Sequence, residues 1–393
     1  MNVLEKQAII SGIGQSPVGR RLGRGALDLT LEAVRNAVED AGLKISDIDG
    51  VASWPGQMEV AGMSPVSILD LKEALRLEVN WYMAGPEATQ MSALINACMA
   101  VATGQARHVV VFRTMTESSA MAEGVRSSVL GQEGAPRVGA MGHWQVPFGA
   151  FSASNWVGLI ASRYFHEFGT KREQMAQLAI NARRNAMLNP NAIYRTPLTL
   201  DDYMNSRMIS TPLCLYDCDV PVDGSMAIII SHRDTAPDLK SQPISIESIC
   251  GPLHERNTWD QQADLTRFAA EAAGQRLWNR TDLKPKDVDV GALYDGFTFL
   301  TMLWLEALGF CGRGEAGPFL EGGHRIALDG ELPLATGGGQ LSAGRMHGVG
   351  LVYEAVVQLR GAGADRQVPG DPRVAVVTNG GGPIASAALL VRH

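Results

Sequence analysis

Two stretches of the chain share one pattern: LKISDIDGVAS at residues 43–53 and LKPKDVDVGALYD at residues 283–295. Each opens with Leu-Lys, passes through a polar turn to Asp-(Ile/Val)-Asp, and ends in an apolar run that is typical of a buried strand. A segment with helical apolar spacing precedes each stretch, Ala26–Ala41 in one case and Leu265–Leu277 in the other. The chain therefore contains an internal repeat of helix, turn and strand.

A second pair of matching segments lies further along. The predicted helix Met91–Thr103 leads to the strand pattern RHVVVFRT, and the predicted helix Gly348–Leu359 leads to RVAVVTNG. Helices that alternate with nearly all-apolar strands are typical of α/β proteins. We therefore expect an α/β fold built from two similar halves, residues 1–235 and 243–393.

Residues 115–225 form an insertion in the first half. The segment is rich in Met, Ser, Gly and Asn, and its spacing predicts helices at Asn155–Phe168 and Lys171–Met187. This composition indicates a cap or substrate loop rather than sheet core. Its methionines would either line a bulky apolar substrate site or fill a core.

Composition limits the possible functions. The 393 residues are 46% hydrophobic and 19% charged, which suits a large folded core, and the formal net charge is −7. That charge makes nucleic acid and anionic membranes unfavourable partners, and the apolar runs are too short to span a bilayer. The N-terminal segment lacks a signal-peptide pattern, so we expect a cytoplasmic protein. The five cysteines lack the spacing of a zinc site, so we expect no metal in this chain.

The run NARRNAMLNPNAIYRTPLTLDDYMNSRMISTPLCLYDCDVPVDGSMAIII, residues 181–230, closely resembles the thiolases of the sterol carrier protein-x branch. Three further motifs of that family follow in the same order: ALYDGFTF (292–299), GGGQLSAGRMHG (337–348) and NGGGP (379–383). The resemblance covers nearly the whole chain. It implies the thiolase fold, which has two pseudo-symmetric βαβαβαββ halves in α-β-α-β-α layers, with the insertion in the first half.

The chain departs from working thiolases at the catalytic positions. The nucleophilic Cys of the family aligns with Glu87, at the start of a predicted helix, and the second, acid–base Cys aligns with Asn379. The family's catalytic His falls on Arg345 or, with a slip of one or two residues, on His347. A glutamate cannot form an acyl-thioester, so a covalent acyl-enzyme is not expected. Glu87 is instead a candidate substrate-pocket residue, or an acid with only an electrostatic role.

The loop Tyr294-Asp295-Gly296-Phe297 resembles the lipid-transfer-protein aldolases of steroid side-chain degradation, which carry Tyr-Asp-x-Phe there. This resemblance implies retro-aldol cleavage of a β-hydroxyacyl-CoA, with a steroid or another bulky side chain, into a ketone and a shorter acyl-CoA. The reaction requires a base for the hydroxyl group and donors for the leaving enolate. The alternatives are a thiolase-like acyltransferase without the usual Cys and a non-catalytic thiolase-fold subunit that scaffolds a partner.

Tyr294 is the candidate base, alone or in a proton relay; the alternative is a tyrosine that only packs at a strand end. Asp295 either orients Tyr294 or, as we favour, caps the helix predicted at Phe297–Leu308. The backbone N–H groups around Asn379 and Gly381 resemble the thiolase oxyanion hole, and we expect them to bind the enolate oxygen.

The loop before the helix Gly348–Leu359 supplies the remaining candidates. His347 is expected to exchange a proton or to donate to the thioester oxygen; the alternative is a loop residue that only caps the helix. Arg345 or Met346 replaces a second tyrosine that the steroid aldolases carry in this loop. Gly344 lies at a loop-to-helix junction, where free backbone N–H groups bind anions or an enolate.

The resemblance also implies partners. We expect a homodimer that pairs through the strand His108–Phe112 and the two residues after it. We also expect a small zinc-ribbon and OB-fold protein that holds the CoA, in a heterotetramer of two copies of each chain, because the sequence shows no P-loop and no basic cluster near the catalytic loops. The alternative is a self-sufficient dimer in which Arg183, Arg184 and Arg195 contact the nucleotide. No cofactor is expected in this chain, since coenzyme A is part of the substrate.

Overall fold

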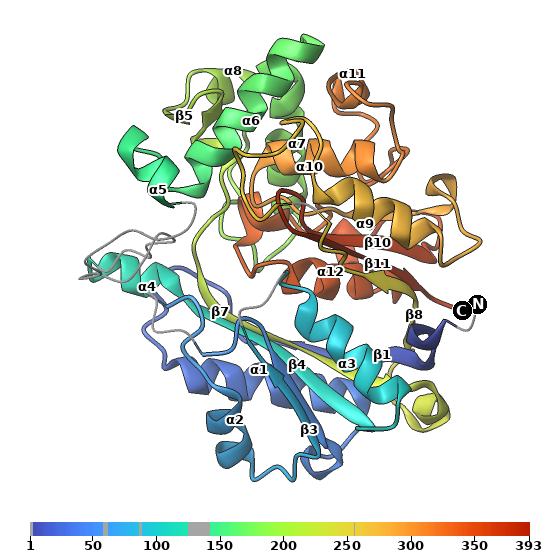
Figure 1. The fold of residues 1–393 in the computed structure, drawn as a ribbon. Helices are drawn as coiled ribbons and strands as arrows, with labels where there is room; N and C mark the ends of the chain where they lie inside the picture. Colours follow the sequence, from blue (N-terminus) through green and yellow to red (C-terminus); the bar gives the residue numbers. More distant parts are fainter. Residues whose placement is uncertain (1–2, 58–61, 86–88, 125–141, 255) are drawn as a thin grey trace.

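A nine-stranded sheet forms the centre of the computed structural model, which describes residues 3–57, 62–85, 89–124, 142–254 and 256–393 (Figure 1). The strands are β1 (Ala8–Gln15), β2 (Gly50–Ser53), β3 (Trp81–Ala84), β4 (His108–Thr116), β7 (Asp223–His232), β8 (Ile244–Cys250), β9 (Val290–Ala292), β10 (Val374–Gly380) and β11 (Ala385–Val391). Their spatial order is β3-β2-β4-β7-β1-β8-β11-β10-β9. The order is mirrored about the junction where β1 pairs with β8, as expected for two similar halves.

The repeat that the sequence predicts is reproduced at two aspartates. The Asp49 carboxylate accepts hydrogen bonds from the N–H groups of Arg107 and His108, at 2.9 to 3.0 Å. In the other half, the Asp289 carboxylate accepts from the N–H groups of residues 373 and 374, at 2.7 and 2.9 Å. Each aspartate lies just before one strand and ties it to the parallel neighbour, so the two halves fix their register in the same way.

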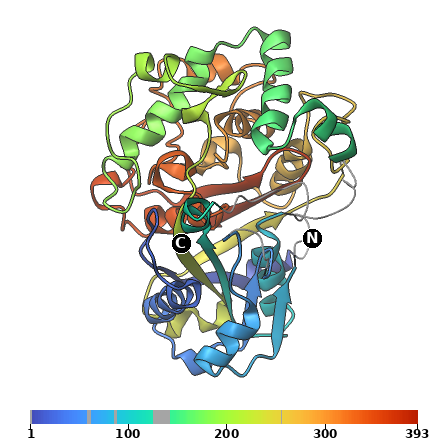
Figure 2. The ribbon, with the colours of Figure 1, turned by 90° about the vertical axis from the view of Figure 1, so that its left-hand side faces the viewer.

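Helices cover the sheet in layers. The first half is covered by α1 (Ala26–Ala41), α2 (Ile68–Leu75) and α3 (Ser92–Ala102), and the second by α9 (Ala269–Trp278) and α10 (Thr298–Ala307). A further helix, α12 (Val349–Leu359), contacts β1 and β7 of the first half as well as β9 and β10 of the second. Figures 1 and 2 show this helix between the two parts of the sheet. The predicted helix at 26–41 has the observed bounds because Gly42, with φ +76°, ends it in a left-handed turn.

Most of the insertion lies over the second half, whereas its first helix, at residues 117–122, contacts the sheet of the first half. Its elements are α4 (Glu117–Ala122), α5 (Gly142–Gln145), α6 (Ala153–Phe168), α7 (Arg172–Ala186), α8 (Leu200–Met204) and the hairpin of β5 (Met208–Ser210) and β6 (Leu213–Cys214). Helix α7 packs on α10 and on α11 (Ala316–Leu320), and Figure 2 shows the green helices beside the orange ones. The amide side chains of Asn181, Asn185 and Asn189 donate to backbone carbonyls between residues 334 and 337. The insertion is thereby hydrogen-bonded to the loops of the C-terminal half.

Two details differ from the sequence-based expectations. Strand β4 pairs with β2 along one side and with β7 along the other, so it has no free edge for a second copy of the chain; the choice of this strand for dimerisation is wrong. The outermost strand of the first half is β3, whose Tyr82 is 69% exposed. Helix α3 begins at Ser92, and Glu87 lies outside the described residues. In the part of the chain that the structure describes, no helix is both long enough and apolar enough to cross a membrane.

Candidate active site

The predicted catalytic loops come together around a short segment of the insertion. The backbone N–H of Asp219 donates to the carbonyl of Gly296 at 3.2 Å, and the N–H of Val220 donates to the carbonyl of Gln340 at 3.1 Å. The carbonyl of Val220 in turn accepts from the N–H of Arg345 at 2.8 Å. The segment therefore lies between the loop that carries Tyr294 and the loop that carries His347, and it places the Asp219 carboxyl between them.

Tyr294 follows β9 and is buried. Its ring lies over Gly296, where an added Cβ would come within 2.7 Å of the ring, so a larger residue at 296 would displace the phenol. Burial raises the pKa of the Tyr294 phenol and the charge of Asp219 raises it further, while the charge of Arg345 opposes both. Tyr294 is therefore a neutral phenol at physiological pH. The arrangement favours the proton-relay alternative over a free phenolate base.

Asp295 acts on the neighbouring loop rather than on the helix that follows it. Its carboxylate accepts hydrogen bonds from the backbone N–H of Gln340, at 2.9 and 3.1 Å, and more weakly from that of Leu341. These residues belong to a π-helical turn, Gly339–Ala343. Helix α10 starts at Thr298 without a side-chain cap, so the predicted capping role of Asp295 is wrong. Asp295 therefore holds the loop that contains Gln340 against the end of β9, where Tyr294 lies.

His347 is held as a neutral ring. Its Nδ1 lies 2.9 Å from Nη2 of Arg113, and because a guanidinium only donates, Nδ1 accepts and the ring proton is on Nε2. Burial and the charges of Arg113 and Arg345 lower the pKa of His347 well below its usual range. Its backbone φ is +45°, an uncommon value for a residue with a side chain. The structure thus presents an N–H donor at this position and disfavours an imidazolium.

Arg113, which sequence reasoning did not select as a site residue, fixes that orientation. The side chain is buried, donates to the carbonyl of Trp54 at 2.8 Å and lies 5.3 Å from the centre of the Trp54 ring. Burial and the nearby Arg345 charge lower the pKa of Arg113 to about 9. The sequence did carry a signal, since an arginine directly after the apolar run 108–112 is unusual for a central strand.

Arg345 is committed to two carboxylates. Its guanidinium forms an ion pair with Glu117 and a second one with Asp219, at 3.0 Å. Burial raises the pKa of the Asp219 carboxyl to about 7; Arg345 acts against this rise, and Glu117 and Asp295 add to it. The structure therefore places Arg345 beside the predicted catalytic residues, as the centre of an acid cluster. Sequence reasoning missed both acids, although Asp219 lies within the family-like run 181–230.

The Gly-rich turn after β10 differs from the expected oxyanion hole. The N–H of Gly381 donates to the carbonyl of Ile384 at 3.0 Å, so it is not free for an enolate oxygen. The Asn379 side chain donates to the carbonyl of His347 at 3.3 Å. Gly348 lies so close that an added Cβ would be 1.5 Å from Nδ2 of Asn379. Asn379 therefore contacts the backbone of the loop that carries His347 and helps to hold it in place. Gly344, with φ +128°, begins that loop.

The cysteines are unsuited to nucleophilic chemistry. Cys98 is fully buried inside α3, and burial raises the pKa of its thiol strongly. Burial also raises the pKa of Cys214 and Cys218, that of Cys250 to about 11 and that of Cys311 to about 12. A thiolate is the reactive form of cysteine, so none of the five is activated. In the described part of the chain, no three His, Cys, Asp or Glu side chains gather as a metal site would require.

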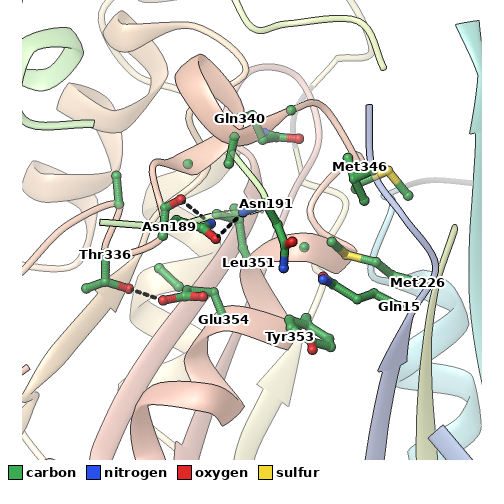
Figure 3. A pocket seen from close by; sticks show the side chains of 18 of the residues that line it. Gln15, Asn189, Asn191, Met226, Thr336, Gln340, Met346, Leu351, Tyr353 and Glu354 are labelled. Carbon is green, nitrogen blue, oxygen red and sulfur yellow. Dashed lines mark hydrogen bonds between the residues drawn. The ribbon is translucent and has the colours of Figure 1, made fainter. Parts of the chain in front are cut away.

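Two of the cavities among the described residues lie near the loops around His347. The smaller, of about 100 Å³, lies next to Gln340 and Met346 and is lined by polar groups such as Asn189, Asn191 and Glu354 (Figure 3). The larger, of about 670 Å³, includes Asp219 and Leu341 in its lining, together with the arginines at 20, 21, 183 and 207. The expectation that no basic cluster lies near the catalytic loops is therefore wrong. Of the three arginines named for the nucleotide, this cavity includes Arg183.

Comparison with known proteins identifies the class. A family model described as "Thiolase C-terminal domain-like" matches residues 251–392. The chain is 36% identical to the "Steroid side-chain-cleaving aldolase" of Thermomonospora curvata, over 99% of each chain. The solved structure of the "Ltp2-ChsH2(DUF35) aldolase" superposes with a TM-score of 0.88 and 32% identity, over 100% of this chain and 99% of that one. The chain therefore belongs to the thiolase superfamily, and the predicted fold class is confirmed.

The relatives also define the branch. The chain is 35% identical to the "17-hydroxy-3-oxo-4-pregnene-20-carboxyl-CoA lyase" of Mycobacterium tuberculosis, over 98% of this chain and 100% of that protein. Within the superfamily, the protein is thus an aldolase, a carbon–carbon lyase that performs retro-aldol cleavage of CoA-linked substrates. The predicted enzyme class is confirmed, and the buried thiols agree with it.

Proposed function

We propose that the protein cleaves a β-hydroxyacyl-CoA whose acyl group is a steroid side chain, and that it releases a ketone on the ring system and a shorter acyl-CoA. The names of the two relatives above support a steroid substrate. The observations that support the chemistry are the neutral N–H donor of His347 and the buried phenol of Tyr294, whose pKa the charge of Asp219 raises. We infer from them that Tyr294 and Asp219 act together as a proton relay. Free cysteines at all five positions suit a cytoplasmic location.

In the proposed mechanism, the relay removes the proton of the substrate hydroxyl group. Tyr294 accepts that proton as its own passes toward Asp219, whose pKa of about 7 suits a general base at neutral pH. The C–O bond becomes a carbonyl, the Cα–Cβ bond breaks, and its electron pair moves into the thioester to form an enolate. The Nε2–H of His347 stabilises the enolate oxygen. The proton held by the relay then returns to Cα, so atoms, charge and electrons balance.

We also propose that the chain works as a homodimer that pairs through the exposed edge of β3 rather than through β4. An outermost strand offers unpaired backbone groups to a second copy, and β3 is such a strand in the described sheet. A small zinc-ribbon and OB-fold partner in a heterotetramer is proposed because the name of the related aldolase structure, "Ltp2-ChsH2(DUF35) aldolase", includes a second protein. Light scattering of the purified chain, alone and with that type of partner, tests both assemblies.

The reaction itself is tested by incubation with two substrates. A steroid β-hydroxyacyl-CoA should yield a ketone and a shorter acyl-CoA in equal amounts, detected by mass spectrometry. A β-ketoacyl-CoA with free CoA, which a thiolase would cleave, should remain unchanged. Thiolysis of the second substrate without cleavage of the first would replace the aldolase proposal by the acyltransferase alternative.

The role of Asp219 is tested by a pH profile. Because Asp219 must be ionised to accept a proton, kcat should rise as the pH rises through about 7. Asp219→Asn should lower kcat roughly 10²-fold and remove that rise. Glu117→Gln, at the other acid paired with Arg345, serves as the comparison: it should lower kcat less and keep the rise. An Asp219→Asn variant with an unchanged pH profile would assign the base elsewhere.

A further inference from the structure

A second buried aspartate, Asp217, lies two residues before Asp219 and ends the turn Leu215–Asp217. Among the described residues, no lysine, arginine or histidine nitrogen lies within 4.0 Å of its carboxylate. Burial of a carboxylate without a cation costs free energy, so hydrogen bonds must stabilise it. The role of Asp217 therefore depends on the groups that donate to it.

Three donors from different parts of the chain meet at the Asp217 carboxylate. The N–H of Cys214, in the residue just before the same turn, donates at 2.7 Å. The hydroxyl of Tyr203, on α8, donates to the two oxygens at 2.6 and 2.8 Å. The hydroxyl of Thr298 donates at 2.6 Å from the start of α10, 81 residues along the chain. The first two donors belong to the insertion, whereas the third belongs to the C-terminal half.

The contact with α10 is the first of three that run in antiparallel register. Cys218 forms a β-bridge with Phe297, and the N–H of Asp219 donates to the carbonyl of Gly296 at 3.2 Å. Residues 217, 218 and 219 therefore face residues 298, 297 and 296 in turn. A shift of one residue in the pairing of extended segments turns each side chain to the opposite face. In the observed register, the Asp219 carboxyl pairs with Arg345.

We propose that Asp217 is a positioning residue: its bond to Thr298 fixes the register of residues 217–220 on the loop that carries Tyr294, and so sets where the Asp219 carboxyl lies. The inference rests on the proposed relay of Tyr294 and Asp219. A carboxylate suits this role because its two oxygens accept several hydrogen bonds at once, whereas an amide has only one acceptor oxygen. If Asp217 only capped its own turn, the Thr298 bond would be dispensable for catalysis.

The experiment removes the two hydroxyl donors one at a time, because Asp217→Ala would leave three donors unpaired in the core and put folding at risk. Thr298→Val removes the bond to the C-terminal half with little change of shape, and Thr298→Ser retains a hydroxyl group. Tyr203→Phe is the matched control, because it removes a hydroxyl donor to the same carboxylate from within the insertion. Both Thr298→Val and Tyr203→Phe should lower the midpoint of urea unfolding, so stability alone does not separate them.

Steady-state kinetics with the steroid β-hydroxyacyl-CoA separates the two variants. Thr298→Val should lower kcat roughly tenfold and leave KM nearly unchanged, because the substrate still binds while the base is misplaced. Thr298→Ser should recover most of the lost kcat. Tyr203→Phe should change kcat by less than about twofold, because the bond across to α10 remains.

The pH profile gives a readout that a loss of stability would not change. Burial raises the pKa of Asp219, Arg345 lowers it, and the charges of Glu117 and Asp295 raise it. When Thr298→Val lets Asp219 shift away from Arg345, that pKa should rise, and the increase of kcat with pH should move above pH 7. The profile of the control should stay in place. Equal losses of kcat with unmoved profiles in both variants would overturn the inference.

Hydrogen exchange at single residues requires no turnover. The N–H groups of Asp219 and Val220 are bonded to the two catalytic loops, so they should exchange slowly in the unaltered protein. Thr298→Val should speed this exchange about tenfold, and Tyr203→Phe should not. If this difference is seen but the unaltered protein cleaves no β-hydroxyacyl-CoA, the register role of Asp217 stands and the proposed reaction fails. Equal exchange rates in the two variants would refute the register role.

Discussion

Equivalent positions of the two halves carry different residues around His347. Trp54 lies five residues after Asp49 (54 − 49), and Tyr294 lies five residues after Asp289 (294 − 289). In the first half an aromatic ring without an acidic proton contacts His347 and Arg113. In the second half the same position carries a phenol beside two buried carboxyls.

The paired strands show the same contrast. Arg113 and Asn379 are each six residues after the arginine that opens their segment, Arg107 (113 − 107) and Arg373 (379 − 373). Both contact His347: Arg113 through the ring and Asn379 through the backbone carbonyl. The scaffold is thus repeated, while Tyr294 and His347 come from the second half and the cation that fixes His347, Arg113, comes from the first. Repeated geometry sets where side chains meet, and residue type decides what each half does there.

The largest expected effect is the difference in kcat between substitutions of the two equivalent aromatic residues, Tyr294 and Trp54. Tyr294→Phe keeps the ring and removes the hydroxyl group, so kcat should fall by roughly 10²-fold or more with little change in stability. Trp54→Phe, at the equivalent position, should lower kcat less than about tenfold, because Trp54 packs and takes no proton. Steady-state kinetics with thermal melts measures both. Equal losses in the two variants would return Tyr294 to a packing role.

A smaller effect is expected on the pKa of His347, which should respond to substitution of Arg113 but not of Asn379. Arg113→Gln removes a positive charge that lowers the pKa of His347, so that pKa should rise and kcat should fall by about tenfold as the ring orientation is lost. Asn379→Ala removes only a hydrogen bond to the backbone and should leave the pKa of His347 unaltered. NMR titration of the His347 ring reports the pKa. A shift of the same size in both variants would refute the assigned role of Arg113.

Where equivalent positions of the two halves carry the same type of residue, substitutions should have equal effects on stability. Asp49→Ala and Asp289→Ala each remove a carboxylate that accepts two backbone N–H groups. Each should lower the free energy of unfolding by about 1–3 kcal/mol. The two losses should add in the double variant, because the sites have no shared partner, and kcat should be retained. Urea unfolding measures the stabilities; a strongly unequal pair would show that the halves are not equivalent in energy.

The smallest expected effect concerns the thiols. Cys98 in the first half and Cys250 in the second are both buried with raised pKa values. Treatment with iodoacetamide under native conditions should therefore leave activity largely intact, and no acyl group should accumulate on any cysteine during turnover. Mass spectrometry of the quenched reaction is the measurement. A thioester on one of the five cysteines would contradict the retro-aldol mechanism.

The sequence predicts the scaffold better than the site. Local signals sufficed for the repeat and for helix α1, because helical spacing, the left-handed Gly42 and the Asp-x-Asp turns act within a few residues. The role of Asp295 depends on Gln340, 45 residues away, and the orientation of His347 depends on Arg113, 234 residues away. Contacts between residues so far apart in the sequence produce no periodic pattern from which they could be predicted. Gly381 failed as a donor for a local reason: in the turn between β10 and β11, its N–H donates to the carbonyl of Ile384.

The segment that lies between the two catalytic loops has a consequence for biosynthesis. Asp219 and Val220 emerge from the ribosome well before the loops to which they bond, at Gly296, Gln340 and Arg345. Contacts of such sequence separation form late, because the chain between them must first close. A nascent chain that ends before residue 345 already contains the acids Glu117 and Asp219, but it lacks the cation that pairs with them. Assembly of the catalytic centre therefore waits until Arg345 has left the ribosome.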